Sequence, residues 1–116
     1  MTTAILKVLT GEDVLAQLKA LRSRQPVKYF AFYSSQLGGI VTDPALMVIP
    51  FDDHIVHRGH GIFDTAGLTN GKIYDLEAHL DRFLLSAERS RLRLPASRGD
   101  MRDIIVKTTA IGGRRE

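Results

Sequence analysis

Residues 70–87, NGKIYDLEAHLDRFLLSA, contain the two signals that decide the fold of this chain. Asn70-Gly71 is a dipeptide favoured where a two-residue hairpin turn needs positive φ angles, so strands are expected in the flanking IFDTAGL and KIYD. Asp75 is placed to cap a helix. Its apolar residues recur three and four positions apart, as on one helical face: Leu76, Leu80, Phe83, Leu84 and Ala87. A hairpin and an amphipathic helix ending before Pro95 are therefore predicted.

Two other stretches carry the start signals of helices. Thr10 and Asp13 have the spacing of a capping box ahead of a helix over about residues 11–23, and Ser97 and Asp100 repeat that spacing further along. The helical apolar positions are Val14, Leu15, Leu18 and Leu21 in the first stretch and Met101, Ile104, Ile105 and Ile111 in the second. Gly112-Gly113 is predicted to end the last helix.

The residues between these helices have the composition of strands. Residues 28–34, KYFAFYS, are rich in aromatic side chains, QLGGI supplies a turn and IVT resumes the extended pattern, which predicts a hairpin. Residues 45–50, ALMVIP, form a short apolar run that predicts a buried strand. The expected fold class is α+β, with an antiparallel sheet of two hairpins over residues 28–74 packed by helices.

Composition excludes several functional classes. The chain of 116 residues has no cysteine, so it has no disulfide framework, thiolate nucleophile or cysteine-type zinc site. The net charge is +3, and the arginines of the C-terminal third are interleaved with leucines and lack accompanying aromatic residues, which argues against nucleic-acid binding. No apolar run is long enough to span a membrane, and no targeting signal can be recognised at the N-terminus. A soluble intracellular protein is expected.

Residues 57–65, HRGHGIFDT, concentrate histidine, arginine and glycine and suggest three kinds of site. A metal site would use His54, His57 and His60, but a spacing of three points side chains to alternating faces of a strand, and the glycines disfavour a regular helix. A phosphate loop would need a Walker pattern or a third glycine and a following helix. The remaining interpretation is a bend between two strands that places His57, Arg58 and His60 at the sheet edge.

Residues 53–65, DHIVHRGHGIFDT, resemble a segment of the fold-type IV, pyridoxal-phosphate-dependent aminotransferases (class IV). The residues that match in register are Asp53, Gly59, Gly61, Phe63 and Thr65, and the resemblance continues through residues 70–87, where the family has Asn-Gly and His-x-x-Arg. Arg58, His60 and Asp64 depart from the family pattern. The resemblance covers roughly residues 29–112 and is nearest to plant-type D-amino-acid transaminases, relatives of branched-chain aminotransferases and aminodeoxychorismate lyases.

The resemblance implies roles for five residues. Arg82 stands where the family places an arginine on the phosphate of pyridoxal 5'-phosphate, with His79 one turn earlier as support. Without the motif, Arg82 would be a solvated residue paired with Glu88 or Asp81. Phe63 would line the substrate pocket, with a core aromatic as the alternative. Arg58 and His60 would meet a substrate carboxylate.

The resemblance also implies parts that this sequence does not contain. The family's Schiff-base lysine, its acidic partner for the pyridine nitrogen and further phosphate ligands belong to a C-terminal catalytic domain, and no lysine here stands at the catalytic position. We expect a helical segment over 1–27 and the small α+β domain over 28–116. The chain would be either the N-terminal portion of an aminotransferase, a homodimer acting on amino acids and 2-oxo acids, or an inactive truncated homologue that associates with a full-length subunit. A plastid location is compatible with the resemblance.

Overall fold

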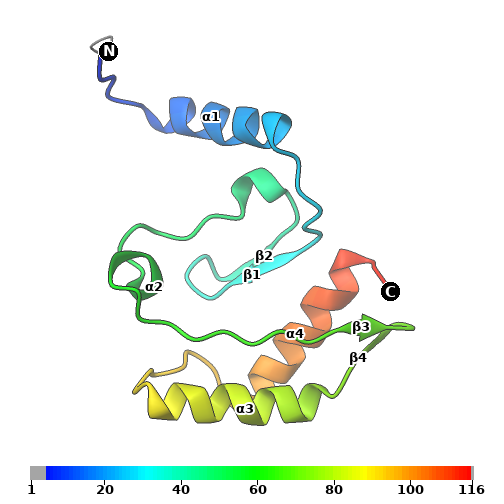
Figure 1. Ribbon diagram of the computed structural model, residues 1–116. Helices are drawn as coiled ribbons and strands as arrows, with labels where there is room; N and C mark the ends of the chain where they lie inside the picture. The colour runs from blue at the N-terminus through cyan, green and yellow to red at the C-terminus, as the bar shows by residue number, and fades with distance from the viewer. Residues whose placement is uncertain (1–4, 116) are drawn as a thin grey trace.

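The computed structural model describes residues 5–115 and has the expected α+β class, with helices and two hairpins in the order shown in Figure 1. The elements are α1 (Gly11–Arg24), β1 (Phe32–Ser34), β2 (Gly39–Val41), the 3-10 helix η1 (Pro44–Leu46), α2 (His54–His57), β3 (Leu68–Thr69), β4 (Lys72–Ile73), α3 (Leu76–Arg89) and α4 (Arg98–Gly112).

Helix α1 begins at the predicted capping box. The Thr10 hydroxyl accepts from the Asp13 backbone N–H at 3.1 Å, and the Thr10 N–H donates to the Asp13 carboxylate at 3.0 Å. The helix lies along η1, at the opposite side of the molecule from α3 (Figure 1). None of its residues is buried, so its apolar face is covered only in part.

The first hairpin is confirmed but short, and the strand predicted over ALMVIP is wrong. Strands β1 and β2 pair antiparallel, with Phe32 opposite Val41. The chain then enters η1 instead of a strand, because Pro44 suits the first helical position and the Asp43 carboxylate accepts from the Ala45 N–H at 3.0 Å. Residues 47–50 have no regular structure.

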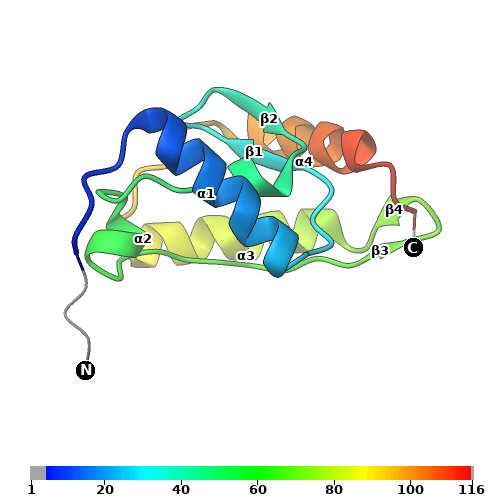
Figure 2. The same ribbon diagram turned by 90° about the horizontal axis from the view of Figure 1, so that it is seen from above.

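The second hairpin is also confirmed, with strands of two residues each. Asn70 and Gly71 have φ angles of 52° and 74°, the pair of positive values that a type I′ turn requires. The two hairpins form separate two-stranded sheets, so the prediction of one sheet over residues 28–74 is wrong. Helix η1, helix α2 and a long segment without regular structure lie between the two hairpins in the chain (Figure 2), and no strand of one hairpin pairs with a strand of the other.

Helix α3 supplies two of the three buried apolar residues in the described part of the chain. Leu80 and Ala87 are buried, and the other three predicted contact residues, Leu76, Phe83 and Leu84, are half-buried, which confirms the predicted apolar face. The helix packs against α4, and α4 contacts β1. Asp75 precedes α3 but makes no side-chain capping bond, because its backbone is left-handed at φ 54°.

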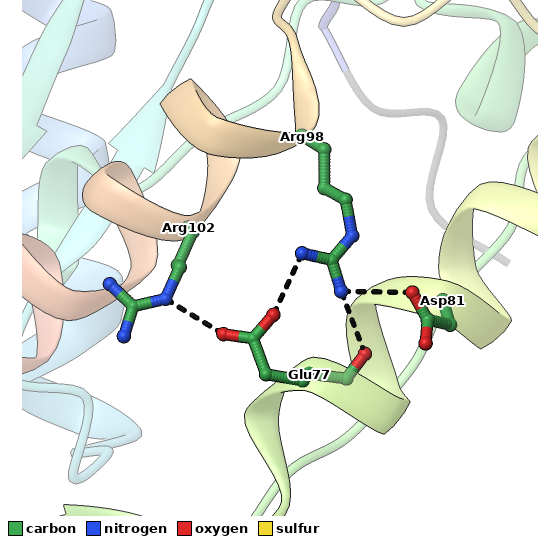
Figure 3. Close-up of polar contacts among 4 residues, drawn as sticks. All are labelled: Glu77, Asp81, Arg98 and Arg102. Atoms are coloured by element: carbon green, nitrogen blue, oxygen red, sulfur yellow. Dashed lines mark hydrogen bonds and ion pairs between the residues drawn. The ribbon is translucent and has the colours of Figure 1, made fainter.

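Helix α4 follows its predicted signals at both ends. The Ser97 hydroxyl accepts from the Asp100 N–H at 3.1 Å, and Gly113 ends the helix in the left-handed conformation. Between α3 and α4 lies a group of ion pairs, drawn in Figure 3. Arg98 contacts Glu77 and Asp81 at 2.7 and 2.8 Å, and Arg102 contacts Glu77 at 2.8 Å.

The core is small for a chain of this mass. Among the described residues, the buried apolar side chains are Ala45, Leu80 and Ala87. The accessible surface is 9385 Å², whereas a compact protein of this mass exposes about 6,300 Å². The radius of gyration is 17.3 Å, against about 13 Å for a compact domain of this length. Large apolar side chains therefore remain available for contact with other protein.

Candidate functional site

The HRGHGIFDT stretch begins at the last residue of the one-turn helix α2 and then continues without regular structure as far as β3, so the predicted bend between two strands is wrong. Helix α2 precedes the glycines instead of including them, and the Asp53 carboxylate caps it by accepting from the Ile55 N–H at 3.0 Å. Gly59 then takes a positive φ of 65°. A Cβ on Gly61 would lie 2.7 Å from the Ile55 side chain, so this position requires the close approach that glycine allows.

The segment over residues 60–67 brings Asp64 against two residues of α3. The Arg82 guanidinium donates from Nε to Asp64 Oδ2 and from Nη2 to Oδ1, both at 2.7 Å. His79 Nδ1 lies 2.7 Å from the same Oδ1 and 2.9 Å from Arg82 Nη2. With the proton on Nδ1, the ring donates to Asp64. His79 and Arg82 share a helix face because they are three residues apart.

We call Asp64, His79 and Arg82 the Asp64 cluster. The side chain of Asp64 is 12% exposed, whereas that of Arg82 is 64% exposed. Hydrogen bonds from Arg82, and then from His79, hold the pKa of the Asp64 carboxyl well below its usual range. The same pairing raises the pKa of Arg82. The carboxylate is therefore ionised at neutral pH and fixes the orientation of the guanidinium.

The pairing leaves part of the guanidinium available for a phosphate group. Asp64 takes the Nε–H and one Nη2–H of five donors, and the side chain as a whole is 64% exposed. One edge of the fork therefore suits an anion's oxygen. The Asp64 cluster therefore suits the role of one of several ligands of a phosphate group. Because the charge of Asp64 balances that of Arg82, other parts of the protein would have to supply the remaining positive charge.

The partner suggested from sequence for a solvated Arg82 is wrong. Arg82 pairs with neither Glu88 nor Asp81. Asp81 contacts Arg98 instead, and the Asp64 carboxylate lies close enough to the Arg82 guanidinium for a bidentate pair. In the sequence, Asp64 stands out only as a departure from the family's glutamate. Residues 62–65, IFDT, do not alternate between apolar and polar side chains, so the local pattern gives no sign that Asp64 turns toward α3; in the structure Ile62 and Asp64 are half-buried and their neighbours are exposed.

The residues predicted to contact substrate are not gathered in one place. Phe63 is 87% exposed, so the alternative of a core aromatic is wrong, and its position next to Asp64 in extended chain turns it to the other side. His60 Nε2 lies 2.9 Å from the Ser90 carbonyl, just beyond α3. Arg58 is exposed at the end of α2. Asp64 and His79 also line an apolar cavity of about 660 Å³ between α3 and α4.

Neither a metal site nor a membrane span is found in residues 5–115. No three histidine or carboxylate residues in this range come close enough to hold a metal ion. His54 and His60 do approach each other, with ring centroids 6.0 Å apart. Within the same range, no helix has the length and apolar content that crossing a bilayer requires.

Comparison with known proteins places this geometry in a family. The family described as "Amino-transferase class IV" matches residues 61–116, a range that contains the whole Asp64 cluster. A chloroplastic D-amino-acid transaminase of Arabidopsis thaliana is 47% identical over 109 residues, or 94% of this chain. Together these matches support a class IV aminotransferase. The chain corresponds to its N-terminal part and spans 29% of the length of the Arabidopsis relative.

More distant aminotransferases match over a shorter range. A D-alanine aminotransferase of Listeria monocytogenes is 29% identical over 62 residues, which is 53% of this chain and 22% of that protein. No solved structure matches. The observed fold, with helices and two small antiparallel sheets, is consistent with the small N-terminal domain of a class IV aminotransferase.

The lowered pKa of Asp64 predicts an acid-dependent stability difference for Asp64→Asn. A carboxyl whose pKa is lower in the folded state stabilises that state above its unfolded pKa, which is about 4, and this contribution is lost as the pH falls toward the folded pKa. Urea unfolding should therefore show wild type more stable than Asp64→Asn from pH 8 to 5, with the gap closing below about pH 4. Asp103→Asn, at an exposed position of α4, is the control. A gap that stays constant into acid would contradict the assignment.

Proposed function

We propose that this chain supplies the small domain of a pyridoxal-phosphate-dependent aminotransferase, with Arg82 as a ligand of the cofactor phosphate. The observation that carries the proposal is the bidentate grip of Asp64 on Arg82, which orients the guanidinium while leaving one edge outward. Arg82 also stands at the arginine of the family's His-x-x-Arg motif. When bound, pyridoxal phosphate supplies the electron sink for chemistry at the substrate's α-carbon.

Each residue of the Asp64 cluster has a separate task in this proposal. Arg82 donates to phosphate oxygens from its outward edge, and Asp64 fixes the guanidinium plane from the other edge. His79 donates to Asp64 and so limits the rotation of the carboxylate. Binding energy of this kind orients the cofactor without taking part in proton transfer.

Substrate contacts are proposed for the residues around the glycines. Phe63 is exposed on the opposite side of the segment from Asp64, so it offers an apolar wall to a bound amino acid. Arg58 and His60 are proposed to meet the substrate carboxylate, and the contact of His60 with the Ser90 carbonyl would orient its ring. The substrate class we propose for the full-length protein is D-amino acids, as in the name of the Arabidopsis relative, with branched-chain amino acids second.

The proposed assembly is a homodimer of two-domain subunits. The division into residues 1–27 and 28–116 is supported by the lack of any buried residue in α1. The surface exposed beyond that of a compact chain is about 3,000 Å², more than the roughly 800 Å² that each partner buries in a standard interface. A plastid location is proposed from the name of the chloroplastic relative. The alternative function is a catalytically inactive truncated homologue that binds a full-length subunit.

The test compares amino donors after the transcript has been read beyond codon 116. If the frame continues, the full-length protein should transfer the amino group of D-alanine to 2-oxoglutarate faster than that of L-leucine. Faster transfer from L-leucine would favour the branched-chain activity, and no transfer from either would refute both. If the frame stops, the alternative predicts that this chain co-purifies with the full-length relative from the same organism, and a failure to do so would refute it.

A further inference from the structure

A second cavity, of about 570 Å³, opens between the end of α1, β1 and α4. Its volume is in the range of small-molecule sites. None of the three residues of the Asp64 cluster lines it. Its walls combine aromatic and aliphatic side chains, among them Phe30, Phe32 and Ile49. Phe30 and Ile49 are 41% and 52% exposed, so the apolar wall is open to a ligand.

The polar residues of this cavity are basic or hydroxylic. Arg22 and Lys28 lie at its margin, and Arg114 stacks over the Phe30 ring with Cζ 4.9 Å from the ring centroid. No aspartate or glutamate is among the described residues that line the cavity. A ligand that places a negative charge near the margin would therefore meet only positive charges.

The Thr108 hydroxyl differs from the other polar groups of the cavity. Its Oγ1 atom is buried and has no hydrogen-bond partner in the part of the chain that the structure describes. The next residue behaves differently, since the Thr109 hydroxyl donates to the Ile105 carbonyl at 2.7 Å, as a helical threonine commonly does. Leaving a buried hydroxyl unsatisfied costs stability, and because Oγ1 has almost no accessible surface, an occupant of the cavity does not reach it.

We propose that this cavity binds a small carboxylate with an apolar body. The apolar part would lie against Phe30 and Ile49, and the carboxylate would lie toward Arg22 and Lys28. A peptide is a poorer occupant because the cavity has the volume of a single small molecule. This proposal does not rest on the function proposed above, since it uses none of the same residues.

The probes are 4-phenylbutyrate and its uncharged amide, titrated into the 116-residue chain by calorimetry. Wild type should bind the acid at least about tenfold more tightly than the amide. The Arg22→Gln/Lys28→Gln variant should lose this preference and keep its affinity for the amide, which shows that the cavity remains folded. Arg89→Gln/Lys107→Gln is the matched control, because it removes one exposed arginine and one exposed lysine from outside the cavity.

Thr108→Val separates binding from folding. Valine has nearly the shape of threonine without the hydroxyl, so this variant should unfold at a higher temperature than wild type and bind the acid with an affinity within about twofold of wild type. Equal affinity of wild type for acid and amide, no binding of either, or a charge preference that survives in Arg22→Gln/Lys28→Gln would overturn the proposal.

Discussion

Purified alone, the 116-residue chain is expected to transfer no amino group from D-alanine or L-leucine to 2-oxoglutarate. Transamination with pyridoxal phosphate depends on a lysine whose amine is held against the cofactor by a preorganised pocket. All five lysines of this chain are exposed: Lys7, Lys19, Lys28, Lys72 and Lys107. An exposed side chain has many rotamers and no fixed place beside the cofactor. The rate should therefore equal that of a heat-denatured sample.

The covalent chemistry of the same lysines gives a second measurement. After incubation with pyridoxal phosphate and reduction with borohydride, mass spectrometry should find small amounts of pyridoxyl-lysine spread over several positions. One lysine modified stoichiometrically, or turnover above the denatured sample, would show that a catalytic lysine lies in this chain after all.

In a full-length protein, Arg82→Ala is expected to raise the dissociation constant of pyridoxal phosphate at least about tenfold, because it removes a charge-assisted hydrogen bond to the phosphate. Arg89→Ala, at the exposed end of the same helix, should change it less than about twofold. The two variants remove the same side chain from α3, so helix propensity changes alike. Cofactor titration followed by absorbance measures both constants.

The outcome is informative only if both variants fold. Arg82→Ala also leaves the Asp64 carboxylate without its main donor, so circular dichroism and thermal unfolding should accompany the titration. Arg82→Lys keeps a positive charge but loses the fork, and an intermediate dissociation constant is expected for it. Equal constants for Arg82→Ala and Arg89→Ala would remove Arg82 from the cofactor site.

Local signals in the sequence were sufficient for the helices and turns. The Thr10 capping box, the Asn70-Gly71 turn and the Gly113 stop depend on backbone geometry within a few residues, and each was found where predicted. The strand over 45–50 failed because a local apolar run does not reveal that Pro44 and Asp43 start a 3-10 turn. The single sheet failed because the pairing of distant strands is not encoded in local periodicity.

The candidate site was predictable only in part. The family motif singled out Arg82 and His79, and the structure brings both to one face of α3. Their partner Asp64 is 18 residues from Arg82 in sequence, so the bidentate pair depends on how the segment over residues 60–67 lies along the helix. The same dependence on tertiary contact applies to the link of His60 with the Ser90 carbonyl.

The ion pairs of Figure 3 and the Asp64 cluster together limit how α3 can roll about its long axis. With 3.6 residues per turn, the faces of Glu77 and Asp81 and of His79 and Arg82 point about 150° apart, on the two flanks of the Leu80 stripe. If α3 rolled in either direction, the contacts on one of the two flanks would lengthen, and those contacts therefore oppose the roll. The pairs with Arg98 and Arg102 are exposed, so salt should loosen that flank first. The orientation of the Arg82 guanidinium would then vary with ionic strength, although its partner Asp64 is mostly shielded from solvent.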